Sequence, residues 1–366
     1  GRPPGDAPGE TRGYDQSGSM TVRIEIGDCI EVLRGLPECL LVNCCVTSPP
    51  YYGLRDYGHA GQIGLESSPA EYVAKMVEVF REVRRVLSDD GTLWLNLGDS
   101  YSPGGRTTQV APTLRTNSSD AASGKQEYLN NFAVRPKGDE WSKPKDLLGI
   151  PWRVAFALQA DGWYLRSDII WHKPNPMPES VTDRPTKAHE YLFLLSKSAR
   201  YYYDAAAIAE AATGQLPGNV SHKFTTAYEE GDEKHRTKAG LVGYANRVRE
   251  RKGCPNGAGA ETRNRRTVWT VPTSPYRGAH FATFPPALIE PCILAGCPEG
   301  GTVLDPFGGA GTTGLVADRL HRNALLIELK PTYAAMARDR IHDDAPLFAR
   351  ATDEATAVHT TDRESV

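Results

Sequence analysis

A glycine-dense segment late in the chain has the residue types that bind a nucleoside. The apolar residues Val303 and Leu304 lead into Asp305, and the sequence Pro-Phe-Gly-Gly-Ala-Gly-Thr-Thr-Gly follows. Glycines there allow the backbone to approach a ligand closely. Glu328 ends the next apolar run, 20 positions after Gly308, which is the spacing at which a carboxylate meets ribose hydroxyls. These residues predict a site for an adenosine-containing ligand: Asp305, Pro306, Phe307, Gly308, Gly309, Gly311, Thr312, Thr313 and Glu328.

The same segment argues against two common nucleotide sites. It lacks the lysine of the phosphate-binding loop of nucleoside triphosphatases, and it departs from the strict G-x-G-x-x-G pattern of dinucleotide-binding proteins. A tight turn with a purely structural role is the alternative interpretation. The strand before the turn, the helix after it and Glu328 favour ligand binding.

A second segment, Thr47-Ser48-Pro49-Pro50-Tyr51-Tyr52, has groups suited to an aromatic amine. The exocyclic amine of a nucleobase is a poor nucleophile, and hydrogen-bond acceptors around its N–H bonds favour the reactive, pyramidal nitrogen. The Ser48 hydroxyl and the Pro49 carbonyl are candidate acceptors, while Pro50 stiffens the backbone. Tyr51 offers a flat face on which an extruded base can stack. The alternative is a proline turn with surface tyrosines.

Periodicity predicts the elements that must position these two segments. Strands are expected at 22–26, 40–46, 92–97, 164–171, 190–195, 302–305 and 324–328, and helices at 69–87, 151–160, 285–295, 311–320 and 331–341. The alternation of strands and helices predicts an α/β fold with a doubly wound, mostly parallel sheet. Both segments follow strands, so we expect them to meet at the carboxyl edge of this sheet.

Together, the two segments resemble the amino-methyltransferases that make N4-methylcytosine or N6-methyladenine in DNA. The order, with TSPPYY first and DPFGGAGTTG last, is similar to the β class of that family, and the resemblance extends over 21–341. It implies a Rossmann-like methyltransferase fold with circularly permuted motifs. It also implies S-adenosylmethionine as the cofactor and a base flipped out of double-stranded DNA as the substrate.

Shorter blocks extend the resemblance. The stretch from Gly27 to Leu33 is similar to a family element whose aspartate lies beside the cofactor adenine, which assigns that role to Asp28. The block ending in Phe284 and Pro285 resembles the one that closes over the methionine end of the cofactor. Blocks at 171–175 and 184–191 resemble those that precede the recognition region. Within the second, we interpret His189 and Glu190 as structural hydrogen-bonding residues rather than as an acid/base pair.

The family's recognition region coincides with a basic segment. From Lys234 to Thr267 there are ten Lys or Arg residues and two acidic ones, a local charge of +8 in a chain of net charge −3. A solvated surface loop is the alternative, but arginine suits both phosphate and base-edge contacts. The residues expected to contact DNA are Tyr52, Arg247, Arg249, Arg251, Lys252, Arg263, Arg265 and Arg266.

The expected reaction is direct methyl transfer to an amino group, without a metal ion or a covalent enzyme intermediate. None of the seven cysteines lies in a nucleophile motif, which argues against methylation of carbon 5 of cytosine. Within this family, serine rather than Asp or Asn at position 48 favours cytosine N4. Adenine N6 is the main alternative. An RNA or protein acceptor and a catalytically silent DNA-binding module are the others.

Composition sets the remaining expectations. Hydrophobic residues make up 40% of the 366 and charged residues 24%, and no apolar run is long enough to cross a bilayer. The cysteines form an odd set without a Cys-x-x-Cys pair, so we expect reduced thiols and no zinc knuckle. These features predict a cytoplasmic protein. The resemblance implies an enzyme of prokaryotic or phage origin that is nucleoid-associated, a monomer or homodimer, with double-stranded DNA and a possible cognate restriction endonuclease as partners.

The expected organisation has five parts. Residues 1–19 form a disordered leader or tag, and 20–204 form the catalytic half of the methyltransferase domain, with a mobile insertion at 102–146. Residues 205–270 form the target-recognition region. Residues 271–342 form the cofactor-binding half, and 343–366 form a flexible tail.

Overall fold

The computed structural model describes residues 21–37, 42–56, 58–59, 61–102, 142–211, 262–274, 283–344 and 350–352. The chain divides into two compact units, one made of 1–202 and 268–366 and the other of 203–267. Among the described residues, no helix has the length and apolar character needed to span a membrane.

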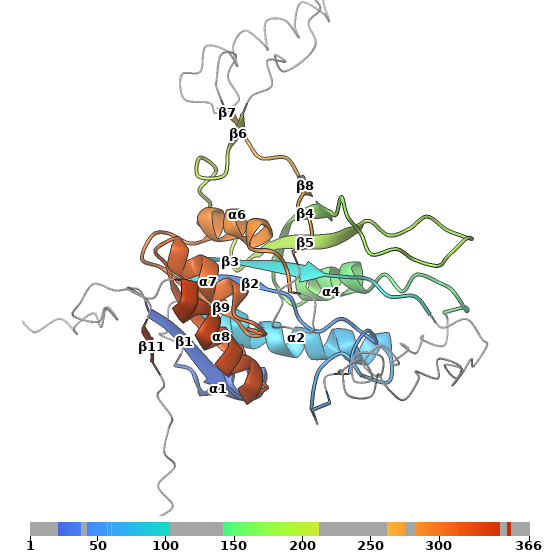
Figure 1. The fold of residues 1–366 in the computed structure, drawn as a ribbon, viewed down its shortest axis with the longest axis horizontal. Coiled ribbons are helices and arrows are strands. Elements are labelled where there is room, and N and C mark those ends of the chain that lie inside the picture. The colour runs from blue at the N-terminus through green and yellow to red at the C-terminus, as the bar shows by residue number, and fades with distance from the viewer. Residues whose placement is uncertain are drawn as a thin grey trace, which may run out of the picture. The chain divides into compact units, whose positions relative to one another are not determined.

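The larger unit is built on one sheet in which the strands lie in the order β11-β1-β10-β9-β2-β3-β5-β4-β8 (Figure 1). Neighbouring strands from β11 to β3 are parallel, and β5 is antiparallel to both of its neighbours. The predicted mostly parallel sheet is therefore confirmed. The strands are β1 (Thr21–Ile26), β2 (Val42–Thr47), β3 (Leu87–Leu97), β4 (Tyr164–His172), β5 (His189–Ser196), β8 (Val268–Thr270), β9 (Thr302–Asp305), β10 (Asn323–Glu328) and β11 (Arg350–Thr352).

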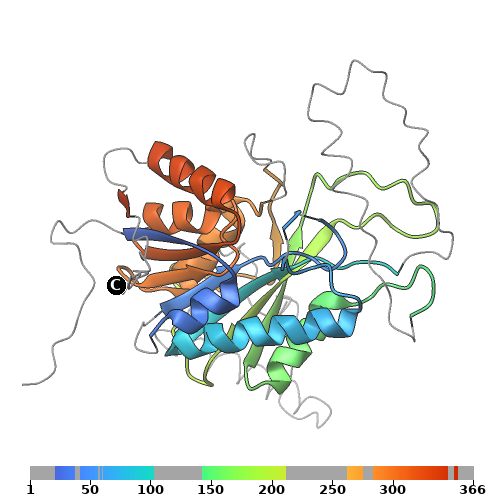
Figure 2. The ribbon, with the colours of Figure 1, turned by 90° about the horizontal axis from the view of Figure 1, so that it is seen from below.

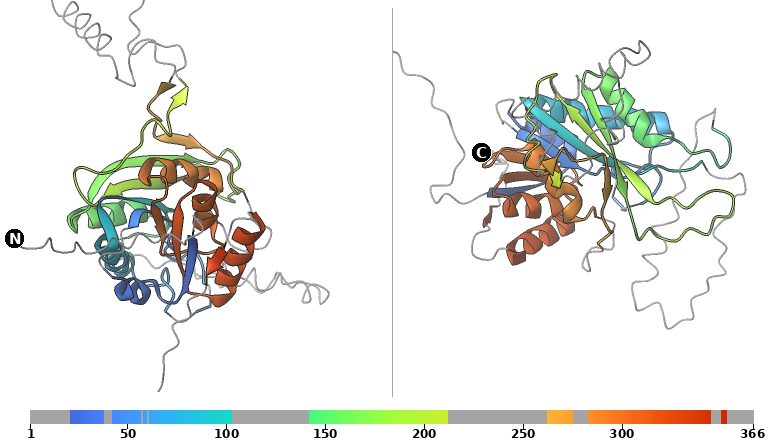
Figure 3. Two further views of the ribbon diagram at one scale, coloured as in Figure 1. Left: turned by 90° about the vertical axis from the view of Figure 1, so that its left-hand side faces the viewer. Right: turned by 90° about the horizontal axis from the view of Figure 1, so that it is seen from above.

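Helices cover both faces of this sheet, as a doubly wound fold requires (Figures 2 and 3). One layer contains α1 (Cys29–Gly35), α2 (Pro69–Val86) and α4 (Ile150–Ala160). The other contains α6 (Pro286–Gly296), α7 (Thr312–Arg319) and α8 (Pro331–Asp344). Local signals start these helices: Ser68 caps α2 by accepting from the Glu71 amide at 3.2 Å, and Pro69 fills the first turn. The strands and helices predicted from periodicity are all present.

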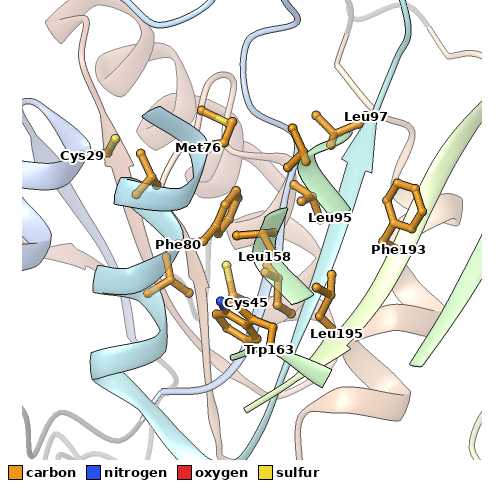
Figure 4. Close-up of a cluster of buried hydrophobic side chains, with 14 of the residues drawn as sticks. Cys29, Cys45, Met76, Phe80, Leu95, Leu97, Leu158, Trp163, Phe193 and Leu195 are labelled. Atoms are coloured by element: carbon orange, nitrogen blue, oxygen red, sulfur yellow. The ribbon is translucent and has the colours of Figure 1, made fainter. Parts of the chain in front are cut away.

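The hydrophobic core lies between the first helix layer and the sheet (Figure 4). The buried residues of α2 recur at three- and four-residue spacing, which places one face of the helix on the sheet. Phe80 and Met76 from that face pack in one cluster with Leu95 and Phe193 from β3 and β5. Full burial of such a side chain contributes about 1.5–3 kcal/mol. The core therefore anchors the strands whose ends carry the two segments.

Two short strands differ from the prediction. Val268–Thr270, placed by sequence inside the recognition region, forms β8 beside β4, with Trp269 opposite Trp171. Arg350–Thr352, placed by sequence in the flexible tail, forms β11 beside β1. Three-residue edge strands are defined by the strand that they pair with, so local periodicity gives no signal for them.

The predicted insertion at 102–146 is ordered at its two ends. The Ser102 amide donates to the Asp146 carbonyl at 2.8 Å, and the Lys145 amide donates to the Ser102 carbonyl at 3.1 Å. Residues 103–141 lie outside the described part of the chain, as do the predicted leader 1–19 and the end of the tail from 353.

The smaller unit shows a two-stranded antiparallel ribbon among its described residues, formed by β6 (Glu210–Ala211) and β7 (Thr262–Arg263). A single carboxylate oxygen of Glu210 accepts from Arg263 Nε at 2.9 Å and from Arg266 Nε at 2.6 Å. These ion pairs tie the two ends of the segment together.

The two chemical segments meet where the direction of chain winding changes. Strands β9 and β2 are parallel neighbours, with Cys44 opposite Val303 and Cys45 opposite Leu304. From β9 the chain passes through α7 to β10 on one side, whereas from β2 it passes through α2 to β3 on the other. Loops that diverge in this way leave a crevice at the carboxyl edge, where ligands bind in such folds.

The Asp305 carboxylate fastens the two loops together at this point. Its side chain is only 1% exposed. One of its oxygens accepts from Thr47 Oγ1 at 2.6 Å and from the Phe307 amide at 3.0 Å, and the other accepts from Thr313 Oγ1 at 2.6 Å. Burial raises the pKa of Asp305, while these hydrogen bonds act in the opposite direction. The end of β2, the glycine turn and α7 thus share one buried carboxylate.

Replacing Gly311 with Ala should destabilise the protein by about 1–3 kcal/mol. Gly311 has φ 74°, and an added Cβ would lie 2.7 Å from Ala337 Cβ. Gly35→Ala is the matched control, because an added Cβ at the end of α1 meets nothing within 4 Å. Urea unfolding should show a lower midpoint for Gly311→Ala alone, and equal midpoints for the two variants would contradict the packing described for α7 and α8.

Thr47→Val should cost about 1.5–3 kcal/mol, because it removes a donor from the buried Asp305 carboxylate while keeping the side-chain shape. Since the Thr47 hydrogen bond lowers the pKa of Asp305, it stabilises the ionised form, and the loss should be larger at mildly alkaline than at mildly acid pH. Thr302→Val on β9 is the control, as that hydroxyl lies outside the network. A loss independent of pH in urea titrations would contradict this role of Thr47.

Candidate active site

One pocket of the larger unit is lined by both chemical segments. It encloses about 1140 Å³ including its open mouth. Ser48 and Pro50 line it from the early segment, and residues from Asp305 to Ala310 line it from the late one. The expectation that the two segments meet is therefore confirmed. Other lining residues are Gly27, Asp28, Cys29, His59, Gly61, Gln62, Ile63, Thr283, Phe284, Thr312, Ile327, Glu328, Leu329, Lys330, Tyr333 and Met336.

The glycine turn forms a floor that leaves room for a ligand. The Gly308 amide donates to the Ile327 carbonyl at 2.8 Å, and an added Cβ at Gly308 would lie 3.0 Å from Leu326 Cβ. Gly309 has φ 51°, a conformation that side-chain-bearing residues rarely adopt. These constraints explain why glycines occupy both positions, and they bring the turn close to the end of β10.

Glu328 lies at the end of β10 with its carboxylate at the pocket wall. One oxygen accepts from the Gly309 amide at 2.8 Å, and the other accepts from the Lys330 amide at 2.9 Å. Each oxygen keeps a further lone pair, which suits a pair of ligand hydroxyls. Burial raises the pKa of Glu328. The prediction that this carboxylate faces the ligand site agrees with its position.

Asp28 also lines the pocket, but it has a structural task as well. One carboxylate oxygen accepts from the Ile30 amide at 2.9 Å and from the Glu31 amide at 3.1 Å, which caps α1. The sequence suggested only a ligand contact for this residue. Its second oxygen has no donor among the described residues, so a ligand contact remains open to it.

Asp305 lines the pocket and also has a structural task. Both of its oxygens accept hydrogen bonds from the protein, as described above, so the side chain shapes the site, and its contact with a ligand stays a prediction. Thr313 and Gly311 lie behind the pocket, where they contact Asp305 and Ala337. Pro285 precedes α6 as its N-cap, and Phe284 supplies the pocket wall.

A side chain of α2 fixes the backbone of the early segment. Tyr72 Oη of α2 donates to the Pro50 carbonyl at 2.9 Å, which fixes the loop at its second proline. No described residue donates to the Pro49 carbonyl, and the Ser48 side chain faces the pocket. The two groups predicted to accept hydrogen bonds from an amine are thus held on a rigid loop.

Tyr51 lies beside Ser48 in a network of polar side chains. Its hydroxyl lies 3.4 Å from Ser48 Oγ, 3.0 Å from Asn96 Oδ1 and 2.7 Å from Glu190 Oε2. Burial, followed by the negative charge of Glu190, holds the pKa of Tyr51 well above its ordinary value. The ring passes over Gly98, where an added Cβ would lie 2.7 Å from Tyr51 Cδ2. The phenol is therefore protonated and fixed in position.

The prediction that Tyr52 contacts DNA is wrong in this structure. Its side chain is 1% exposed, and its ring packs against Tyr72 with the centroids 5.6 Å apart. Its carbonyl accepts from Ser100 Oγ at 2.7 Å. Two adjacent tyrosines at a loop point in different directions, and the sequence does not indicate which one enters the core.

The predicted DNA-contacting arginines are only partly described. Arg263 and Arg266 pair with Glu210 within the smaller unit, and Arg265 lies between them. Arg247, Arg249, Arg251 and Lys252 lie outside the described residues. Contact of these side chains with DNA stays a prediction.

Several site residues were missed by sequence reasoning. Gln62, Tyr333 and Met336 line the pocket, and Asn96 and Lys173 join the Tyr51 network. Tyr333 and Met336 share α8, whereas the other three come from separate parts of the chain, so no local pattern links the whole set. For Glu190, the sequence indicated structural hydrogen bonding, which the bond to Tyr51 Oη agrees with.

Comparisons with known proteins give the same family as the site. The DNA methylase family of N6 and N4 methyltransferases matches residues 42–339. The Type II methyltransferase M.SmaI of Serratia marcescens is 46% identical over 326 residues, covering 89% of this chain and 92% of that one.

Two solved structures share the fold. The putative DNA modification methylase TTHA0409 of Thermus thermophilus, in complex with S-adenosyl-L-methionine, has a TM-score of 0.50 at 23% identity and covers 91% of this chain and 100% of its own. The cytosine-N4-specific PvuII DNA methyltransferase also has a TM-score of 0.50, at 20% identity, covering 90% and 94%. The matched family model and the 46% identity to a Type II methyltransferase show that the chain belongs to the DNA methylase family and is an S-adenosylmethionine-dependent DNA methyltransferase.

Proposed function

We propose that this enzyme methylates the N4 amino group of a cytosine flipped out of double-stranded DNA. The observation that carries the proposal is the single pocket lined by Ser48 on one side and by the glycine turn with Glu328 on the other. This arrangement puts an amine-binding loop beside a nucleoside-binding turn. DNA as the substrate follows from the family, whereas the choice of cytosine N4 over adenine N6 is the proposal.

The pocket fits S-adenosylmethionine, which supplies a methyl group already activated on a sulfonium. Glu328 would hold the ribose hydroxyls, the backbone of Gly308 and Gly309 would lie along the ligand, and Asp28 would lie at the adenine end. Phe284 would cover the methionine end. The carboxylates also suit a ligand that carries positive charge at its centre.

The chain's own contribution is to orient the amine. Ser48 Oγ and the Pro49 carbonyl would accept the two N–H bonds, which directs the nitrogen lone pair toward the methyl donor. As the N–C bond forms, the S–C bond of the sulfonium would break and leave a neutral thioether, and the amine would release one proton from an N–H bond that these oxygens accept. Tyr51 supports the loop through its ring and its hydroxyl.

Ser48 favours cytosine over adenine. Within this family, serine at this position is typical of N4 enzymes, and Asp or Asn is typical of N6 enzymes. A short neutral hydroxyl needs no counter-charge in a half-buried pocket, whereas a carboxylate would need one. The N4 specificity printed for the PvuII enzyme agrees with the proposal, although that similarity is one of fold.

Sequence recognition is assigned to the smaller unit, 203–267. Its basic segment carries the predicted phosphate and base-edge contacts. By analogy with the Type II relatives, a cognate restriction endonuclease would recognise the same site.

Product analysis tests the proposal directly. DNA from a host without other methylases, incubated with the enzyme and S-adenosylmethionine, should yield N4-methylcytosine by nucleoside mass spectrometry. RNA offered in parallel should stay unmodified. N6-methyladenine as the product would contradict the choice of base, and modified RNA without modified DNA would contradict the substrate class.

Two substitutions should separate the two halves of the pocket. Ser48→Ala should lower kcat by about 10²–10³ with little change in cofactor affinity, as for loss of a transition-state hydrogen bond. Glu328→Gln should weaken cofactor binding about tenfold, with kcat at saturating cofactor nearly retained.

Lowering the pH should weaken cofactor binding by the wild type in the same way as the Glu328→Gln substitution. Because burial raises the pKa of Glu328, protonation should weaken cofactor binding by the wild type as the pH falls through the raised value, and the variant should lack this dependence. Titration calorimetry measures these affinities. For the Ser48→Ala variant, loss of cofactor binding with intact turnover would contradict the assignment of Ser48 to the amine-binding side of the pocket.

A further inference from the structure

An ion pair lies directly behind the amine-binding loop. Lys173 Nζ contacts Glu190 Oε1, and the two side chains are only 18% and 16% exposed. The Lys173 ammonium also lies 4.2 Å from the centre of the Trp171 ring, and Trp171 Nε1 donates to the Val271 carbonyl at 2.8 Å. A cation held by a carboxylate and a fixed ring has little freedom to move. Glu190 is therefore a fixed negative end of the network.

The Tyr51 hydroxyl has one proton and two nearby acceptors. Glu190 Oε2 is the closer at 2.7 Å, and a hydrogen bond to a carboxylate is about twice as strong as one to an amide oxygen. Asn96 Nδ2 donates to the Tyr191 carbonyl at 3.1 Å, which turns Asn96 Oδ1 toward the phenol. Both partners thus draw the phenol proton away from Ser48, and the buried phenol keeps that proton.

With its proton turned away, the Tyr51 oxygen offers only lone pairs to Ser48. The Ser48 hydroxyl, 3.4 Å away, can then donate to Tyr51 but cannot accept from it. Its own lone pairs are left for the pocket. A serine without such a partner could rotate and point its proton at the substrate amine, which would oppose the reaction.

We propose that Glu190 and Lys173 are positioning residues that act through the Tyr51 hydroxyl, so that Ser48 presents an acceptor and not a donor to the substrate amine. The proposal rests on the amine-binding role given to Ser48 above. It assigns to Tyr51 a task for its hydroxyl, in addition to the base stacking that the sequence predicts for its ring.

A double-mutant cycle tests this route. Tyr51→Phe keeps the ring and removes the hydroxyl, and Glu190→Gln keeps the shape and removes the charge. Each should lower the single-turnover rate at saturating cofactor and DNA by about tenfold, a loss of about 1.4 kcal/mol, with cofactor affinity unchanged. The double variant should be no slower than the slower single variant, because both changes break the same chain of hydrogen bonds.

Matched controls separate this route from a general structural effect. Glu179→Gln removes a carboxylate from another ion pair of the β4–β5 connection, with Arg184 at 2.6 Å, and should leave the rate unchanged. Lys173→Arg keeps the positive charge and should retain most of the rate, whereas Lys173→Met should match Glu190→Gln. In a Ser48→Ala background, Glu190→Gln should have no further effect.

Three results would overturn the proposal: multiplicative losses in the double variant, a further loss from Glu190→Gln in the Ser48→Ala background, or a slow Glu190→Gln variant whose cofactor affinity falls in parallel. Thermal denaturation of each variant identifies misfolded protein. If Glu190→Gln misfolds, the rates of Lys173→Arg and Lys173→Met are compared instead, and equal rates for these two variants would overturn the proposal. The mutant cycle measures the rate of methyl transfer and does not depend on which base is methylated. The positioning role can therefore be contradicted while the wild type still makes N4-methylcytosine. It can also be supported if the product is N6-methyladenine.

Discussion

The buried Asp305 carboxylate is the interaction on which the site depends. Thr47 at the end of β2, Phe307 in the glycine turn and Thr313 at the start of α7 all donate to it. A buried carboxylate is costly unless it is fully hydrogen-bonded, and removing a single donor leaves part of that cost exposed. The loops from 47 and from 305 are 258 positions apart in sequence, and this group holds them at one distance.

The change in winding direction and the groups proposed to react lie at the same edge of the sheet. Because the chain winds in opposite directions from β9 and β2, their loops leave an open crevice at the carboxyl edge of the sheet. The late loop supplies backbone amides and a carboxylate to hold a nucleoside. The early loop supplies acceptors for an amine. The transfer therefore needs orientation from the protein and little else.

The direction of the hydrogen bonds at the early loop depends on side chains from more distant strands of the sheet. Glu190 lies on β5, two strands beyond β2 in the sheet, and Lys173 directly follows β4, which is three strands beyond. Both reach the loop through Tyr51. Such buried polar networks favour one arrangement of hydrogen bonds only when each member is satisfied. Gly98 at the end of β3 completes the arrangement by leaving space for the Tyr51 ring.

Sequence alone predicted the sheet, its helices and the meeting of the two loops, because hydrophobic periodicity and glycine or proline turns are local signals. It missed β8 and β11, which exist only through their pairing with β4 and β1. It did not predict the structural task of Asp305 and it assigned Tyr52 to DNA, since residue type does not reveal which side of a loop a side chain faces. The Lys173–Glu190–Tyr51 chain joins three elements, and no spacing in the sequence encodes it.

A crystal structure of the enzyme with S-adenosylmethionine would show whether the two loops hold the donor and the acceptor side by side. We expect the sulfonium methyl to lie between the glycine turn and Ser48 Oγ, with the ribose hydroxyls on Glu328. A cofactor bound elsewhere, or one whose methyl group points away from the Ser48–Pro50 loop, would contradict it.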